Sequence, residues 1–393
     1  MANDMYDAIV IGGGVMGCAT AYYLMKFDPR LKVVVLEMDP TYAKASTPLS
    51  DGNTRIQFNV KENIQMSQYG LEVLKTFAED MAVGNEKPDI AFRQQGNLFV
   101  LDDASRDEAY EGMLLQRSLG CEVYWLTPEE VQQRFPLYNL KNCSAGAFGP
   151  LDGTMSPMAV LNAYKHKAIS LGAKYIQAEA IEVLHQAGRV TGVRTATGEV
   201  LRGGIALNAA GAWAPLIAQT AGVNLPIAPT KRQITIVETN YRSESILPML
   251  FLPSGLYIVH EGAGLFMIGK SFPDDYVGYD DFRWEKSIFE ERIWLELADH
   301  IPLFDRLKIL RGWAGLYEVN TLDGNAILGE ALQMQGFFFA NGFSGHGFQQ
   351  AHAVGRYTAE LMLGKPPALD LSVFSASRIA ENKPILESKK KII

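Results

Sequence analysis

The stretch Asp7-Ala-Ile-Val-Ile-Gly-Gly-Gly-Val-Met-Gly17 decides the fold of this chain. Its apolar run ends in three glycines, and the residues from Val15 to Met25 then have the length and composition of a helix. A second apolar run, Leu31 to Glu37, is expected to form a buried strand. Together these segments predict a strand–helix–strand unit of about thirty residues, the size that a parallel crossover needs.

The glycines match the dinucleotide-binding pattern G-x-G-x-x-G. Gly12 would make the tight turn, Gly14 would let the backbone approach a pyrophosphate, and Gly17 would let helix and strand pack closely. The first turn of the helix would offer N–H donors to the phosphates. Glu37 ends the second strand, where an acid can accept hydrogen bonds from a ribose diol. We therefore expect dinucleotide binding, and the alternative is a glycine-rich turn without a ligand.

The composition is that of an ordinary globular protein, and it excludes several classes of function. The 393 residues suffice for two or three folding units, and 48% hydrophobic residues are far from the signature of disorder. A net charge of −8 lacks the basic field that nucleic-acid binding needs. Three separated cysteines indicate neither a disulfide framework nor a metal site. Because no segment predicts a transmembrane helix, we expect a soluble, cytoplasmic protein.

The remaining pattern predicts two interleaved lobes. An antiparallel sheet is expected from the apolar runs Ile234 to Glu238, Leu256 to His260 and Leu265 to Lys270. The final part of the chain returns to the first pattern, with a strand at Gly336 to Ala340 and a helix from about Gly347 to Leu363. Further helices are predicted at Asn63 to Asp80, Pro157 to Leu171 and Trp284 to Leu297, and Thr127-Pro-Glu-Glu130 has the residues of a capped helix start.

These elements suggest where the lobes divide. We expect a discontinuous cofactor-binding domain from residues 1–90, 145–220 and 310–370, a substrate-binding domain from residues 91–144 and 221–309, and a C-terminal tail at 371–393.

A second glycine-rich turn, Asn341-Gly-Phe-Ser-Gly-His-Gly-Phe348, follows the last predicted strand. An NAD dehydrogenase has no obvious use for such a turn. With Ala45-Ser-Thr-Pro-Leu-Ser-Asp-Gly-Asn-Thr-Arg55, Asn208-Ala-Ala-Gly-Ala-Trp213 and Asn320-Thr-Leu-Asp-Gly-Asn325, it makes the chain resemble the FAD-dependent oxidoreductases of the D-amino-acid oxidase superfamily. The likeness is to the branch of sarcosine oxidase, sarcosine dehydrogenase and glycine oxidase, and it covers nearly the whole chain.

The resemblance implies an α/β fold. It consists of a glutathione-reductase-like FAD-binding (Rossmann) lobe and an interleaved α+β substrate lobe built on an antiparallel sheet. Through Arg55-Ile-Gln-Phe58 and Glu62-Asn-Ile-Gln-Met-Ser67, the chain also resembles the mitochondrial FAD-dependent oxidoreductase-domain proteins linked to respiratory complex I assembly.

The resemblance also implies which residues contact FAD. They are Gly12, Gly14, Val15, Met16, Gly17, Glu37, Met38, Ser46, Thr47, Ser50, Asn53, Thr54, Arg55, Ile181, Ala210, Gly211, Gly315, Gly342, Phe343, Ser344, Gly345, His346, Gly347, Phe348 and Gln349. FAD is expected to be non-covalent, because the family's attachment cysteine is missing near Gly315 and no histidine lies between Ser46 and Arg55. The N–H groups that begin the last helix would stabilise the negative charge that reduction places near flavin N1 and C2=O.

Two positions depart from sarcosine oxidase, in which both are cationic and bind the substrate carboxylate. Gln349 stands in place of a lysine and Phe58 in place of an arginine. A buried carboxylate needs a cationic partner, so either another cation binds it or the substrate differs. Arg232 and Lys270 are the candidates, and a surface salt bridge or a snorkelling side chain is the alternative for each.

His346 and Tyr257 complete the candidate catalytic residues, which are His346, Lys270, Gln349, Arg232 and Tyr257. The ring of His346 could border flavin and substrate, or it could cap a helix. Tyr257 could form a pocket wall, or it could be a cross-strand packing residue.

We expect a flavoenzyme that oxidises the C–N bond of a small amine or amino acid, such as sarcosine or another N-methyl amino acid, proline, glycine or a D-amino acid. Hydride would pass to flavin N5, and water would hydrolyse the imine. Oxygen or a carrier would accept the electrons. The alternatives are a 2-hydroxy-acid or polyol oxidoreductase on the same fold, and a non-catalytic FAD-binding assembly or partner subunit of a larger complex.

Overall fold

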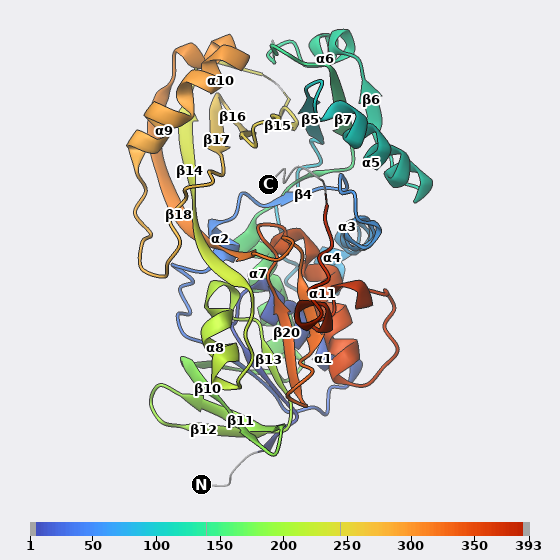
Figure 1. The fold of residues 1–393 in the computed structure, drawn as a ribbon, viewed down its shortest axis with the longest axis vertical. Helices are drawn as coiled ribbons and strands as arrows, with labels where there is room; N and C mark the ends of the chain where they lie inside the picture. Colours follow the sequence, from blue (N-terminus) through green and yellow to red (C-terminus); the bar gives the residue numbers. More distant parts are fainter. Residues whose placement is uncertain (1–4, 139, 244, 388–393) are drawn as a thin grey trace.

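The computed structural model of the chain describes residues 5–138, 140–243 and 245–387. A six-stranded sheet lies in the lower half of Figure 1, in the order β19-β20-β13-β2-β3-β9. Its strands are β2 (Ala8–Ile11), β3 (Val33–Glu37), β9 (Lys174–Gln177), β13 (Ala206–Asn208), β19 (Ile327–Glu330) and β20 (Phe337–Asn341). All neighbours are parallel except β19 and β20. Strands β2 and β3 are buried on both faces, which explains their continuous apolar sequence.

Alternate residues of this sheet pack into two different cores. Val10 and Val35 contact the core of α1 (Val15–Phe27), α7 (Pro157–Ser170) and α11 (Gly347–Met362). Ile9 and Val34 face the other core, which contains α8 (Ala214–Thr220) and a four-stranded sheet. That sheet consists of β1 (Met5–Tyr6), β10 (Ala180–Gln186), β11 (Arg189–Thr195) and β12 (Val200–Gly203). The lower sheet therefore has one core on each face, and its parallel strands β2 and β3 are those that the first strand–helix–strand unit predicts.

An eight-stranded sheet forms the upper half of the molecule, in the order β18-β14-β17-β16-β15-β5-β7-β6 (Figure 1). Its strands are β5 (Asn97–Leu101), β6 (Tyr124–Leu126), β7 (Ala145–Gly149), β14 (Ile227–Glu238), β15 (Met249–Phe251), β16 (Tyr257–Gly262), β17 (Leu265–Gly269) and β18 (Lys308–Asn320). All neighbours are antiparallel except β15 and β5. The expected antiparallel sheet is therefore present.

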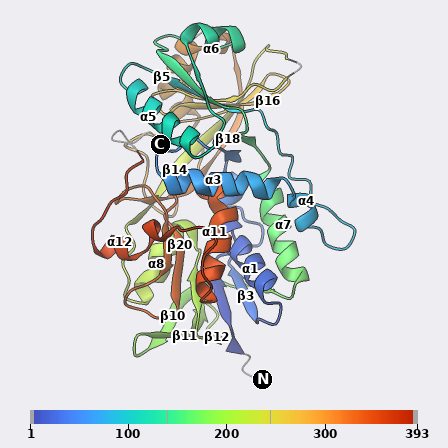
Figure 2. The same ribbon diagram turned by 90° about the vertical axis from the view of Figure 1, so that its right-hand side faces the viewer.

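Helices cover this upper sheet, and short elements join it to the lower one. The covering elements are α5 (Arg106–Ser118), α6 (Pro128–Arg134), α9 (Lys286–Arg292), α10 (Trp294–His300) and η2 (Pro302–Asp305). Between the halves lie α2 (Ser46–Leu49), the strand pair β4 (Asn53–Thr54) and β8 (Gly153–Thr154), and α3 (Lys61–Leu74), which crosses the middle of Figure 2. The other short elements are α4 (Phe77–Asp80), η1 (Gly211–Trp213), η3 (Ser372–Phe374) and α12 (Ser377–Ala380).

Two predicted helices are interrupted in the structure. The helix expected at 63–80 ends at Leu74, and a separate turn begins at Phe77, whose buried ring packs edge-on against Tyr164 and His352. The helix expected at 284–297 begins only at Lys286, because the Trp284 indole donates a hydrogen bond to the Thr235 hydroxyl. It breaks again at the buried Ile293.

One predicted helix start is confirmed in detail. Thr127 and Glu130 form a reciprocal capping box at the start of α6.

The residue limits of the two domains stay a prediction. Strands β7 and β18, which the prediction assigns largely to the cofactor domain, pair within the eight-stranded sheet. Residues 388–393 of the predicted C-terminal tail lie outside the described residues. Within the described ranges, no helix is long and apolar enough to cross a membrane, and no cluster of His, Cys, Asp and Glu suits a metal ion.

Candidate functional site

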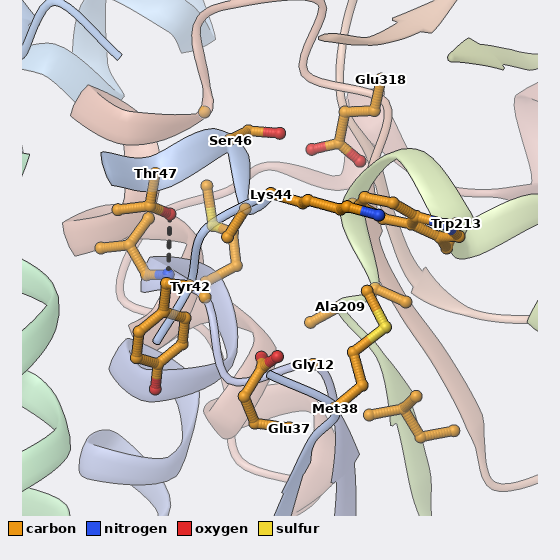
Figure 3. Close-up of a pocket in the computed structure, with 18 of the residues that line it drawn as sticks. Gly12, Glu37, Met38, Tyr42, Lys44, Ser46, Thr47, Ala209, Trp213 and Glu318 are labelled. Carbon is orange, nitrogen blue, oxygen red and sulfur yellow. Dashed lines mark hydrogen bonds between the residues drawn. The ribbon is translucent and has the colours of Figure 1, made fainter. Parts of the chain in front are cut away.

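A cavity of about 610 Å³ opens at the carboxyl ends of β2 and β3. Its walls come from these strand ends, α2, η1, the end of β18 and the start of α11. Figure 3 shows labelled side chains of this lining. Ligands bind at this edge in open α/β sheets, because the strand ends and helix N-termini meet there.

The glycine loop gives the cavity a floor of backbone. Gly12 has φ +101°, and a Cβ there would lie 2.4 Å from the carbonyl oxygen of Ala209. A Cβ at Gly17 would lie 1.9 Å from the carbonyl oxygen of Gly12. Glu37 accepts a hydrogen bond from Gly13 N–H at 2.8 Å, and burial raises the pKa of its carboxyl group. These contacts require glycine and leave the backbone open to a pyrophosphate, so the loop fits a dinucleotide.

Helix α1 points its N-terminus into the cavity. It has no side-chain cap, and no acidic residue lies in its first turn. The Val15 N–H donates to the hydroxyl of Thr47 at 3.2 Å, the bond drawn in Figure 3. Ser46 fixes α2 against β18 by donating to the carbonyl of Leu316 at 2.7 Å. An uncapped N-terminus with a hydroxyl beside it is suited to a phosphate group.

The structure divides the predicted FAD residues into two groups. Those that line the cavity are Gly12, Gly14, Val15, Met16, Glu37, Met38, Ser46, Thr47, Ser50, Ile181, Ala210, Gly211, Phe343, Gly345, Gly347 and Phe348. Those that do not line it are Gly17, Asn53, Thr54, Arg55, Gly315, Gly342, Ser344, His346 and Gln349. The individual FAD contacts stay predictions.

Several lining residues with charged or aromatic side chains are absent from the predicted FAD contacts. Lys44 and Trp213 line the cavity, and Glu318 projects from β18 into its upper part (Figure 3). The Glu318 carboxylate accepts a hydrogen bond from Gly342 N–H at 3.0 Å, and burial raises its pKa to about 7. Trp213 ends the motif Asn208-Ala-Ala-Gly-Ala-Trp213, but Glu318 reaches the site only through the pairing of β18, which no local pattern reveals.

The start of α11 brings predicted catalytic residues together. His346 is buried, with its ring edge-on to Phe58 at 5.2 Å between centroids. Burial, and secondarily the charge of Arg55, lowers the pKa of His346 to about 3, so its imidazole is neutral. Its Nε2 has no hydrogen-bond partner among the described residues. Gln349 accepts a hydrogen bond from the Arg55 backbone N–H at 2.7 Å, which ties the helix start to the loop before α3.

Arg55 has the most unusual environment of the cations in this region. The residue is 8% exposed, and its guanidinium lies over the rings of Phe58, Phe99 and Phe251 at 4.7, 5.3 and 5.5 Å. Burial lowers its pKa from the usual value. In the described part of the chain, no side chain forms an ion pair or a hydrogen bond with this guanidinium. A desolvated, unpaired cation of this kind is suited to an anionic ligand.

The two predicted carboxylate-binding cations are already paired. Arg232 forms an ion pair with Asp275, and its guanidinium lies 5.5 Å from the ring of Tyr317. Lys270 forms an ion pair with Glu296 of α10, on the side of the sheet that the helices cover.

Tyr257 lies instead with the aromatic residues around Arg55. It is buried, with its ring 6.3 Å from that of Phe251. The structure thus groups His346, Gln349 and Tyr257 around Arg55 and leaves Lys270 apart. The catalytic roles of all five residues stay predictions.

Comparison with known proteins agrees with this geometry. The sequence pattern of the family described as FAD dependent oxidoreductase (DAO) matches residues 7–361. The chain is 34% identical to FAD-dependent oxidoreductase domain-containing protein 1 of Xenopus laevis, over 97% of this chain and 84% of that protein.

Solved structures of similar fold are consistent with this family. L-proline dehydrogenase from P. horikoshii has a TM-score of 0.86 at 28% identity, over 97% of this chain and all of that one. Glycine oxidase from Geobacillus kaustophilus has a TM-score of 0.82 at 24% identity, over 95% and 99% of the two chains. The expected FAD-binding fold and the FAD cofactor are confirmed. The chain therefore belongs to the DAO family of FAD-dependent oxidoreductases.

Proposed function

We propose that this protein oxidises the C–N bond of a small amino acid, with Arg55 as the partner of the substrate carboxylate. The observation that carries the proposal is the unpaired guanidinium of Arg55, which lies over three phenylalanine rings. The backbone of Arg55 is hydrogen-bonded to Gln349, directly after the second glycine-rich turn. Gln349 and Phe58 are uncharged, and Arg55 contacts both of them, so Arg55 would supply the cation that a substrate carboxylate needs.

The energetics favour a ligand-binding role over a structural one. A buried unpaired charge is destabilising, and a guanidinium binds a carboxylate through two parallel hydrogen bonds. Cation–π contacts with the rings offset part of the desolvation cost while leaving the N–H donors free. Structural arginines of this chain are paired instead, as Arg378 is with Asp323.

The other residues suit amine oxidation. Bound FAD would supply the hydride acceptor. His346 is neutral and offers an unpartnered Nε2, so it adds no charge that would oppose a neutral amine. The aromatic side chains of Phe58, Phe99, Phe251 and Tyr257 would offer a bound substrate apolar surroundings, which would keep water from the reacting carbon. The start of helix α11 lines the cavity, where its first N–H groups would stabilise negative charge on the bound flavin.

The relatives add support of a coarser kind. The similar structures include proteins named L-proline dehydrogenase and glycine oxidase, and a curated relative is named sarcosine oxidase subunit beta. The substrates in these names are amino acids, and each carries one carboxylate.

The test is an anaerobic titration of the FAD-loaded protein with N-methyl amino acids, proline, glycine, D-amino acids and 2-hydroxy acids. Loss of the flavin band at ~450 nm with an amino acid supports the proposal. Loss with a 2-hydroxy acid alone overturns it in favour of alcohol oxidation. A flavin band that no compound bleaches overturns it in favour of a non-catalytic FAD-binding subunit.

A further inference from the structure

The end of the described chain returns to the region beside Arg55. After α12, the segment rises from the lower half toward α3, as its dark red trace shows in Figure 1. The carboxylate of Glu387 accepts hydrogen bonds from the backbone N–H groups of Asn59, at 2.6 Å, and Val60, at 3.2 Å. It also accepts one from the side-chain amide of Asn63. Burial raises the pKa of the Glu387 carboxyl group above its usual value, and the three donors, which reach both carboxylate oxygens, oppose that shift.

A buried polar network holds this segment in place. Ile385 N–H donates to the carboxylate of Asp323 at 3.0 Å, and its carbonyl accepts from the amide of Asn325 at 2.8 Å. Asp323 is fully buried and forms an ion pair with Arg378. The position of Glu387 is therefore fixed by its own hydrogen bonds and by those of Ile385, two residues before it.

The same network reaches the residues around Arg55. Asn63 donates to Asn325 at 2.7 Å and accepts from Gln350 at 3.0 Å. Gln350 follows Gln349, which holds the Arg55 backbone. The negative charges of Glu387, Asp152 and Asp51 raise the pKa of Arg55 and so oppose the effect of burial. Glu387 forms no ion pair with Arg55, so the guanidinium remains free.

We propose that Glu387 is a specificity-determining residue that limits the site to ligands with one carboxylate. Its negative charge is held at Asn59 and Val60, directly after Phe58, whose ring contacts the guanidinium of Arg55. A first carboxylate is attracted by Arg55 and mildly opposed by Glu387. A second carboxylate on the same ligand would meet the negative charge without a cation of its own. The inference rests on the proposed role of Arg55 and names its substrate class as monocarboxylic amino acids, with acidic ones excluded.

The test compares butyrate and succinate, which have the same number of carbons and differ by one carboxylate. Their dissociation constants are measured by calorimetry on FAD-loaded protein, for the wild type and for Glu387→Gln. In the wild type we expect butyrate to bind more tightly than succinate. In Glu387→Gln we expect the ratio of the two constants to fall by on the order of tenfold, because a dianion gains more than a monoanion from removal of a negative charge.

Three further variants of this chain test whether the charge of Glu387 causes the change in the ratio. Glu381→Gln removes an exposed acid of the same tail, paired only with Lys383 in the described chain, and should leave the ratio unchanged. Glu387→Asp keeps the charge and should retain most of the discrimination. Glu387→Ala removes the same charge with a different side chain, so it should reproduce the Glu387→Gln ratio even where one of the two variants folds poorly.

The outcomes separate this inference from the proposed function. If butyrate binds and Arg55→Met abolishes its binding, but the ratio is the same in Glu387→Gln and the wild type, then Glu387 is only structural and the inference is overturned. If butyrate binding is absent or independent of Arg55, the role of Arg55 itself is overturned, and this inference with it.

Discussion

Replacing Arg55 by methionine is the sharpest perturbation of the proposed site. Methionine is unbranched and polarizable, so it suits the cage of Phe58, Phe99 and Phe251 without a charge. The substitution deletes charge-assisted hydrogen bonds to a carboxylate, which together are worth about 2–4 kcal/mol. At about 1.4 kcal/mol per factor of ten, the dissociation constant for a carboxylate substrate should rise roughly 30- to 700-fold.

The effect on stability should have the opposite sign. Arg55 is buried without an ion pair among the described residues, so its removal relieves a desolvated charge. The free energy of unfolding of Arg55→Met should equal or exceed that of the wild type. This combination distinguishes a ligand-binding arginine from a structural one, whose loss would weaken folding.

The assay is anaerobic stopped-flow reduction of the flavin across a range of substrate concentrations, with urea denaturation of the same samples. Arg55→Lys is the matched control, because it keeps the charge but loses the planar fork and should be intermediate in affinity. The reasoning is refuted if Arg55→Met binds the carboxylate substrate as tightly as the wild type. It is also refuted if the variant is strongly destabilised while substrate affinity is unchanged.

Three other substitutions test separate parts of the structure. Gly17→Ala places a Cβ 1.9 Å from the carbonyl oxygen of Gly12. The dissociation constant for FAD should therefore rise roughly 5- to 150-fold, for about 1–3 kcal/mol of strain. Gly204 has open space around it, so the control Gly204→Ala should retain the flavin absorbance of the wild type. Thr127→Ala breaks the capping box of α6 and should cost about 1 kcal/mol in urea denaturation without changing flavin reduction. Burial lowers the pKa of His352 to about 4 from an ordinary 6.5, so the unfolded chain takes up a proton first as the pH falls through that window. Stability should then fall by up to about 1.4 kcal/mol per pH unit from this residue, and urea midpoints of His352→Gln should have a correspondingly shallower pH slope.

Local patterns were sufficient for the cofactor half of the molecule. The glycine loop, α1 and β3 are consecutive in the chain, and their geometry follows from backbone constraints that the sequence displays directly. The start of α11 was found for the same reason, because its glycine-rich turn lies between a strand and a helix.

The substrate side depends on contacts between distant segments, which periodicity does not reveal. Arg55 was assigned to the cofactor loop, yet its guanidinium environment is made by Phe99 and Phe251 from two strands of the upper sheet. Lys270 directly follows strand β17, and Glu296 of α10 is its ion-pair partner. Such pairings are decided by how elements dock and not by any local pattern.

The most direct measurement is a crystal structure of the FAD-loaded protein with a monocarboxylate such as butyrate bound. The account predicts a carboxylate within hydrogen-bonding distance of the Arg55 guanidinium, inside the cage of phenylalanine rings. A carboxylate bound elsewhere, or an Arg55 side chain occupied by the flavin itself, would contradict it.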